Sequence, residues 1–140
     1  MPAVKDIMSK EVISVPPSAH IIDVAQKMLT YGQHIILVCD NGKLCVVVTE
    51  RDIVVSIVAT ARDPIRTYIS SLMKNHLPSL SSSDDILLAA KLMVDHATRV
   101  LTVVENGKLA GLLTLDDLAR ESPALAAMVF CKTVNATEQR

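Results

Sequence analysis

A threonine followed three residues later by an aspartate occurs twice, as Thr49-Glu50-Arg51-Asp52 and as Thr114-Leu115-Asp116-Asp117. Two interpretations of this spacing are compatible. A threonine N-cap with an acid at the third helical position forms a capping box, which satisfies free N–H groups at a helix start. The same carboxylate can accept hydrogen bonds from vicinal hydroxyls of a ligand, beside a helix start that favours phosphate. The spacing therefore predicts a strand-to-helix corner in both cases and a sugar-phosphate site in the second.

The two motifs belong to an internal duplication. Adding 65 to each residue number takes Met8 to Met73 and Asp52 to Asp117, and it places Asn41-Gly42-Lys43-Leu44 on Asn106-Gly107-Lys108-Leu109. Most other aligned pairs exchange one aliphatic residue for another. A repeat of this size buries too little surface to be stable alone, so we expect the two copies to share a core.

Each copy predicts the order strand, helix, strand, strand, helix. We expect the strands at residues 12–15, 35–39 and 44–48, and again at 77–80, 100–104 and 109–113. Ser18 and Ser83 precede apolar residues at helical spacing, which predicts them as N-caps of the first helices. Each Asn-Gly pair predicts a type I′ hairpin turn. In the first hairpin, Cys39 should then face Leu44 and Val38 should face Cys45.

The segments outside this pattern complete the domain prediction. Short helices at 4–8 and 65–73 lead into the two copies, so residues 4–62 form repeat 1 and residues 63–122 form repeat 2. The fold class is α+β, with a small mixed sheet in each repeat. The tail, residues 123–140, holds an apolar helix at 124–132. With Leu125, Met128 and Val129 exposed, such a helix would be expected to cover a subunit interface.

Composition and charge argue against several classes of function. A formal net charge of −1 disfavours a nucleic-acid partner. The longest run without charged residues, 28–39, is too short to cross a bilayer, and no apolar signal segment precedes it. We therefore expect a soluble, cytoplasmic protein. The cysteines and histidines show no metal-ligand spacing, and no catalytic triad or Gly-rich phosphate loop is visible, so we expect no metal site and no enzyme.

The doubled strand–helix–hairpin–helix pattern, the Asn-Gly-Lys-Leu hairpins and the closing Thr-x-x-Asp resemble the cystathionine-β-synthase (CBS) domain. Two tandem copies resemble the CBS pair, or Bateman module, over about residues 4 to 122. The resemblance implies repeats packed through their sheets about a pseudo-two-fold axis, with two clefts. It also implies dimeric discs that bind adenosine ligands as sensors rather than as catalysts.

The resemblance assigns residues of both copies to each cleft. In the first cleft, Thr49 and Asp52 would hold a ribose and Arg51 a phosphate. The other residues assigned to it are Val47, His34, Ile35, Met73, Leu77, Pro78, Thr98 and Arg99. In the second cleft, Thr114 and Asp117 would hold the ribose. The other residues assigned there are Met8, Val12, Ile13, Gln33, His34, Arg99 and Leu112.

The two clefts are not equivalent. Arg51 can make charge-assisted bonds to a phosphate, whereas its counterpart Asp116 would repel one, so the first cleft is favoured for a nucleotide. Val46 stands where the second copy has Gly111, and it either crowds the favoured cleft or fills the core. The expected function is a regulatory sensor of AMP, or of ADP or ATP, that acts as a homodimer on a protein partner. Two alternatives stay open, namely a ligand-independent assembly module and a sensor of S-adenosylmethionine.

Overall fold

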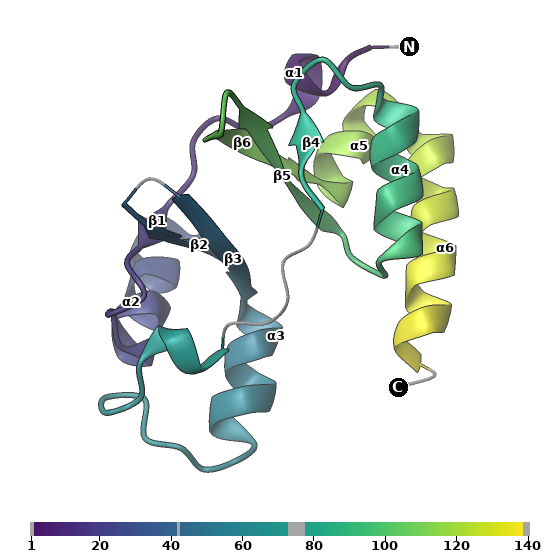
Figure 1. Cartoon of the computed structure of the whole chain (residues 1–140). Coiled ribbons are helices and arrows are strands. Elements are labelled where there is room, and N and C mark those ends of the chain that lie inside the picture. Colours follow the sequence, from purple (N-terminus) through teal and green to yellow (C-terminus); the bar gives the residue numbers. More distant parts are fainter. Residues whose placement is uncertain (1, 42, 73–77, 139–140) are drawn as a thin grey trace. The chain divides into compact units, whose positions relative to one another are not determined.

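The computed structural model describes residues 2–41, 43–72 and 78–138, and for residues 44, 45 and 135–138 it describes the backbone alone. Both copies have the predicted order of elements (Figure 1). The first copy consists of β1 (Ser14–Val15), α2 (Ile21–Tyr31), β2 (Ile35–Asp40), β3 (Lys43–Thr49) and α3 (Glu50–Ile53), which continues as a π-helical segment (Val54–Val58). The second consists of β4 (Leu80–Ser81), α4 (Ile86–Asp95), β5 (Val100–Glu105), β6 (Lys108–Thr114) and α5 (Leu115–Glu121). Outside the copies lie α1 (Val4–Ile7), a 3₁₀ turn (Ile69–Leu72) and α6 (Pro123–Glu138).

Each copy forms its own three-stranded mixed sheet, ordered β1-β2-β3 and β4-β5-β6. The first strand of each sheet is parallel to the second, which is antiparallel to the third. The α+β class with small mixed sheets is therefore confirmed. In the second hairpin, Asn106 and Gly107 have φ values of +52° and +75°, as a type I′ turn requires.

The hairpin register differs from the prediction by one residue. Cys39 faces Leu44 as expected, but Val38 faces Val46 rather than Cys45. A β-bulge inserts one extra residue into the return strand at this point. The second hairpin repeats it, because Val103 faces Gly111 and Ala110 is the extra residue. A two-residue turn fixes the register only as far as the first irregularity of the ladder, so the turn sequence alone did not predict the bulge.

The predicted N-caps Ser18 and Ser83 are wrong. The helices begin two residues later, with His20 and Asp85 as N-caps. The polar run before each helix first forms a tight turn, in which the Asp84 backbone N–H donates to the Ser81 carbonyl at 3.0 Å. Asp85 Oδ1 then accepts the Leu87 N–H at 2.9 Å. Asp85 therefore caps the helix in place of Ser83.

The chain divides into two compact units that do not coincide with the repeats. Unit 1 holds the described residues up to Glu11 and from Pro78 onward, and unit 2 holds those from Val12 to Leu72. The leading segment α1 therefore packs with the second copy, where the Val4 N–H donates to the Asp84 carbonyl at 2.8 Å. The equivalent turn, Ile69–Leu72, packs in the core of unit 2, with the Ile69 N–H on the Ala19 carbonyl at 2.8 Å. The repeat limits 4–62 and 63–122 follow the duplication and stay a prediction of domain boundaries.

The tail helix α6 packs against α4 and α5 in unit 1 (Figure 1, yellow). Val129 is fully buried in the core of this unit and Leu125 packs beside it, so the expectation that both are exposed is wrong. Only Met128 of the three is exposed. The apolar residues of the tail helix pack into the core of unit 1. Sequence periodicity alone does not distinguish such packing from a subunit interface. Among the described residues no helix is long and apolar enough to span a membrane.

Candidate functional site

The first Thr-x-x-Asp lies at the corner of unit 2 where β3 ends and α3 begins. The Thr49 N–H donates to Asp52 Oδ2 at 2.9 Å, and the Thr49 hydroxyl donates to the same oxygen at 3.1 Å. The Asp52 N–H donates in return to Thr49 Oγ1 at 3.3 Å. The predicted capping box is therefore formed. It fixes the carboxylate at the corner with its side chain only partly buried.

Three further predicted residues of the first cleft surround this corner within unit 2. The His34 carbonyl accepts the Glu50 N–H at 3.2 Å, so His34 lies directly beside the start of α3. Ile35 pairs with Thr49, and Val47 lies two residues earlier on the same strand. The side chains of His34 and Arg51 are exposed. This corner thus offers a carboxylate, a guanidinium and an imidazole within one unit.

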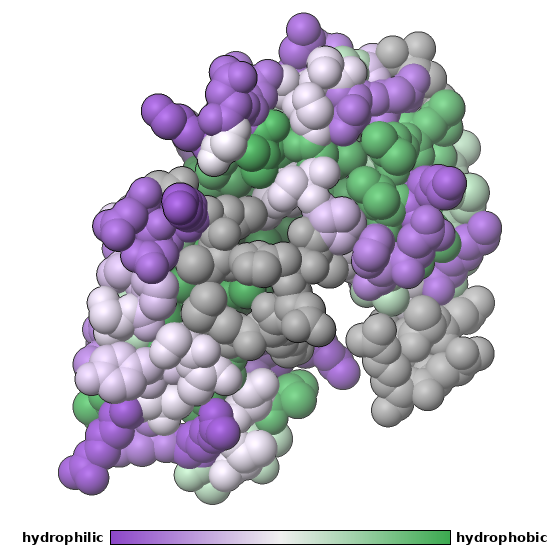
Figure 2. Space-filling model, in the orientation of Figure 1, coloured by the Kyte–Doolittle hydropathy of each residue, from purple (hydrophilic) through white to green (hydrophobic). Residues whose placement is uncertain are grey.

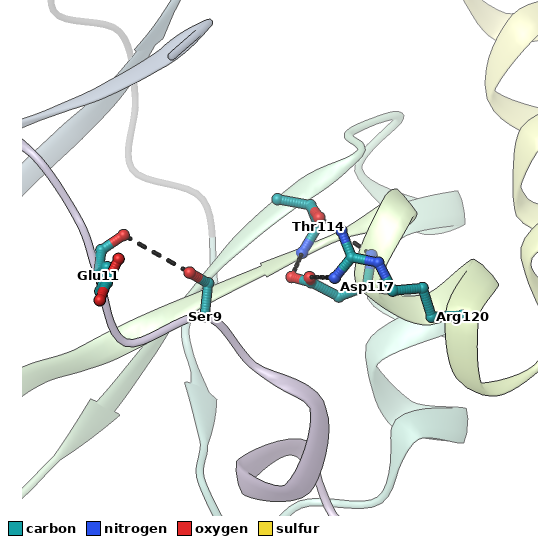
Figure 3. A network of polar contacts seen from close by, with 5 residues as sticks. All are labelled: Ser9, Glu11, Thr114, Asp117 and Arg120. Carbon is teal, nitrogen blue, oxygen red and sulfur yellow. Dashed lines mark hydrogen bonds and ion pairs between the residues drawn. The ribbon is translucent and has the colours of Figure 1, made fainter. Parts of the chain in front are cut away.

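The second Thr-x-x-Asp forms the equivalent corner of unit 1, between β6 and α5 (Figure 3). The Thr114 N–H donates to Asp117 Oδ2 at 3.0 Å, and the Asp117 N–H donates to Thr114 Oγ1 at 3.2 Å. The other carboxylate oxygen, Oδ1, accepts Nη1 of Arg120 at 3.1 Å. Asp117 is only 6% exposed. Both oxygens of this carboxylate therefore already have partners in the protein.

Arg120 is a residue of this corner that the sequence reading missed. It lies three positions after Asp117 on the same helix, a spacing at which opposite charges meet. That spacing is visible in the sequence and is the signal that predicts the contact. Its counterpart in the first copy is Val55, which has no donor. The first corner therefore has no ion pair from this position.

The leading segment of the chain runs along β6 beside the second corner. Ser9 and Leu112 exchange two backbone hydrogen bonds, at 2.8 and 2.9 Å. A Cβ on Gly111 would lie 2.4 Å from the Ser9 carbonyl oxygen and 3.3 Å from Met8 Sδ. Unit 1 thereby brings together Met8, Leu112, Thr114 and Asp117, four of the residues predicted for the second cleft. The equivalent residue of the first copy, Val46, fills the core of unit 2.

The other predicted residues lie in separate parts of the chain. Val12, Ile13 and Gln33, which were assigned to the second cleft, are in unit 2. Pro78, Thr98 and Arg99, which were assigned to the first, are in unit 1. Met73 and Leu77 lie outside the described residues. Each unit therefore holds only part of the residues assigned to its corner.

Both repeats within the chain match the CBS domain family, over residues 4–59 and 69–124. A CBS domain-containing protein of Bacillus subtilis is 34% identical over 119 residues, which cover 85% of this chain and 84% of that protein. An uncharacterised protein of Methanopyrus kandleri is 28% identical over 129 residues, which cover 91% of this chain. The match covers 66% of that protein, so the chain corresponds to about two thirds of its length.

A third relative bears on metal binding. Hypoxic response protein 1 of Mycobacterium tuberculosis is 27% identical over 135 residues, or 96% of this chain and 94% of that protein. A crystal structure of Hypoxic Response Protein I with two coordinated zinc ions has a TM-score of 0.76 and 26% identity, covering 87% of this chain and 100% of that chain. In the part of our chain that the structure describes, no three His, Cys, Asp or Glu side chains gather as a metal site requires. Sequence and fold agree: the chain belongs to the CBS domain family and carries two copies in tandem.

Proposed function

We propose that the chain is a regulatory module that binds an adenosine nucleotide, with AMP as the first candidate and ADP or ATP next. CBS pairs generally act as regulatory modules that bind ligands, and typically they do not catalyse reactions. The ligand would bind at the Thr49–Asp52 corner of unit 2. Its occupancy would change the affinity of a homodimer for a protein partner.

The observation that carries this choice of corner is the different exposure of the two carboxylates. A ribose offers two vicinal hydroxyls that donate to a carboxylate, and a phosphate favours a guanidinium. Asp52 is partly exposed, Arg51 is exposed one residue before it, and position 55 is an apolar valine. At the other corner, a ribose would have to displace Arg120 from a carboxylate that is 6% exposed. The carboxylate of the first corner is therefore the more accessible of the two to a ribose, and a guanidinium lies one residue before it.

Isothermal titration calorimetry on matched variants tests the proposal. Asp52→Asn keeps one side-chain oxygen for the capping box but removes the charge, and Asp117→Asn does the same at the other corner. Hydrogen bonds to charged groups contribute about 1.5–3 kcal/mol, so Asp52→Asn should weaken AMP binding by roughly ten- to a hundredfold. Asp117→Asn should change it by less than about threefold.

A panel of AMP, ADP, ATP, S-adenosylmethionine and GMP, read by thermal shift, ranks the ligands. A ligand that binds only the native state raises stability with the logarithm of its concentration over its dissociation constant. AMP should give the largest shift. Equal or reversed losses in the two Asn variants would refute the choice of corner. If S-adenosylmethionine alone shifts the melting temperature, the module senses that compound instead.

A specific observation also favours the second candidate function, a ligand-independent assembly module. Unit 2 has an uncovered apolar helix face, formed by Leu29 of α2 and by Val54 and Val58 after α3, which are 85%, 55% and 69% exposed. In unit 1 the residues equivalent to Leu29 and Val54 are Val94 and Ala119, which are partly buried against the core, on the helices α4 and α5 that pack with α6. Because the described residues of unit 2 include no helix equivalent to α6, we propose that a second copy of the chain covers this face.

Light scattering after size-exclusion chromatography tests this face. Val58→Glu should convert a dimer into a monomer, because it buries a charge in an apolar contact. Leu87→Glu is the control, because Leu87 of α4 is 49% exposed but lies in unit 1, outside the proposed face. Figure 2 shows that the visible surface of unit 1 mixes green apolar residues with purple hydrophilic ones. A dimer that survives Val58→Glu would exclude this interface. A dimer that binds none of the five compounds would favour assembly over sensing.

A further inference from the structure

The helix that follows the Thr49–Asp52 corner changes its hydrogen-bond register after one turn. α3 (Glu50–Ile53) is α-helical and Val54–Val58 is π-helical, and the two form one continuous helix (Figure 1). The Ala59 N–H donates to the Val54 carbonyl, five residues back, at 2.8 Å. A π turn contains one residue more than an α turn, is rare and occurs frequently at functional sites. Here it begins two residues after the corner.

The second copy keeps an α register at the equivalent place. α5 (Leu115–Glu121) is α-helical, and the Ser122 N–H donates to the Leu118 carbonyl, four residues back, at 2.8 Å. Adding 65 places Val54–Val58 on residues 119–123, where α5 ends and α6 begins. The duplication therefore does not account for the π segment. It follows the corner for which we propose nucleotide binding.

A threonine hydroxyl supports the π register. Thr60 Oγ1 donates to the Ser56 carbonyl at 2.6 Å. In an α-helix the same carbonyl would accept the Thr60 backbone N–H, four residues on. The α register therefore satisfies the Ser56 carbonyl without the hydroxyl, whereas the π register relies on it. Loss of this hydroxyl should favour the α register.

The end of the helix holds a strained residue. The Ala61 N–H donates to the Val58 carbonyl at 3.2 Å, and the Arg62 N–H donates to the Ile57 carbonyl at 3.0 Å. These two bonds form a Schellman end, in which the left-handed residue is usually glycine. That residue is Ala61, with φ of +58°, and α2 has Gly32 in the same role, with φ of +62°. The alanine Cβ disfavours this conformation, so the present end of the helix is costly.

The chain beyond this end is anchored to the start of α2. The Ile22 N–H donates to the Pro64 carbonyl at 3.0 Å, and the Ile21 N–H donates to the Thr67 carbonyl at 2.9 Å. These bonds satisfy two N–H groups that the first turn of a helix leaves without partners. Residues 59–63 must therefore take up any change of register, and the strained alanine lies among them.

A change of register would alter the surface of unit 2 without exposing its core. Ile53 and Ile57 pack in the core, and residues four apart lie on one face of an α-helix, so Ile57 would still face inward. Val58, which is 69% exposed, would still face outward. Both side chains would lie at a new angle about the helix axis. Val58 would thereby shift sideways against Leu29 in the apolar helix face of unit 2.

We propose that Val54–Val58 is a register switch through which nucleotide binding at the Thr49–Asp52 corner changes the apolar helix face. The inference rests on the proposed function for its ligand and site, and it adds the regulation of that site. A bound nucleotide would fix Arg51 and Asp52 in the first turn of the helix. Once a first turn is fixed, each further α-helical residue adds one hydrogen bond. The nucleotide therefore favours the α register and moves Val58.

NMR couplings across hydrogen bonds read the register directly in the full chain. Without nucleotide, the Ala59 nitrogen should couple to the carbonyl carbon of Val54. With saturating AMP this coupling should weaken, and a coupling to the Val55 carbonyl should appear. A coupling to Val55 in both conditions overturns the inference. So does a coupling to Val54 that stays unchanged while AMP shifts the amides of Thr49 and Asp52.

Calorimetry on variants measures the same coupling from the side of the ligand. Deletion of Val55 removes the extra residue and imposes the α register, with Ile53 and Ile57 three positions apart and still on one face. Coupling between ligand and register is reciprocal and is typically about fivefold or more, so AMP should bind this variant at least about fivefold more tightly. Val55→Ala is the matched control, because Val55 is 50% exposed and the residue count is kept. Its affinity for AMP should equal that of the wild type.

Thr60→Val tests the switch without a deletion. It should tighten AMP binding by a smaller factor, and it should transfer part of the Ala59 coupling to Val55 before AMP is added. Wild-type affinity in the deletion variant, or weaker AMP binding in Thr60→Val, overturns the inference. The proposed function fails separately, when AMP leaves the amides of Thr49 and Asp52 unchanged and releases no heat.

Discussion

Gly111→Ala is the substitution for which the structure gives the most specific expectation. An added Cβ would lie 2.4 Å from the Ser9 carbonyl oxygen. This atom belongs to the backbone and cannot rotate away, so the leading segment must move off β6. The movement breaks the two hydrogen bonds between Ser9 and Leu112.

The expected loss of stability follows from these contacts. Two backbone hydrogen bonds contribute about 1 kcal/mol each, and overpacking adds about 1–3 kcal/mol. Alanine favours a strand over glycine by about 0.5–1 kcal/mol, which offsets part of this. We therefore expect Gly111→Ala to lower the free energy of unfolding by about 2–4 kcal/mol.

Urea unfolding measures the loss, and amide hydrogen exchange locates it. The Ser9 and Leu112 amides should exchange much faster in Gly111→Ala. Gly107→Ala is the matched control, because Gly107 has φ of +75° and nothing within 4 Å of an added Cβ. Its free energy of unfolding should fall by only about 1–2 kcal/mol, because alanine is strained at this positive φ. The Ser9 amide should stay protected. Unchanged stability and unchanged Ser9 exchange in Gly111→Ala would show that the segment does not pack on β6 as described.

Three other substitutions test the corners and the tail. Arg120→Leu should lower the free energy of unfolding by about 1 kcal/mol, since it unpairs the buried Asp117, and the loss should shrink in 1 M salt. A loss that does not depend on salt would argue against the ion pair. Thr49→Ala should cost about 1 kcal/mol through the lost N-cap, measured by urea unfolding, and no change would contradict the capping box. Val129→Ala should cost about 2 kcal/mol or more, because α6 fills the core of unit 1. A neutral Val129→Ala would indicate an undocked tail.

Much of the fold follows from the sequence because its signals are local and occur twice. The Thr-x-x-Asp spacing predicted both capping boxes, and the Asn-Gly pairs predicted the hairpins. The bulges at Cys45 and Ala110 and the helix starts at His20 and Asp85 were not predicted. Both depend on how a polar or apolar run is divided between a turn and the next element, which propensity does not determine.

The packing of each leading segment with the other repeat could not be predicted from local signals either, for a different reason. The pairing of Ser9 with Leu112 joins residues more than a hundred positions apart, and apolar patterns do not specify which sheet a short helix covers. Gly111 was visible as an unusual residue, but its partner was not. The same holds for Arg99, whose contacts with Phe130 and Thr133 need the docked position of α6. The Thr-x-x-Asp residues of each corner were predicted, whereas Arg120 and these long-range neighbours were not.

An AMP titration followed by the amide NMR signals of Thr49 and Asp52 tests the central claim most directly. These two N–H groups close the capping box, so a ribose that binds the Asp52 carboxylate must change their surroundings. Saturable shifts of both signals, lost in Asp52→Asn, are the predicted result. If both signals stay in place at millimolar AMP in a folded wild-type protein, this corner is only a helix cap and the proposed sensor function is wrong.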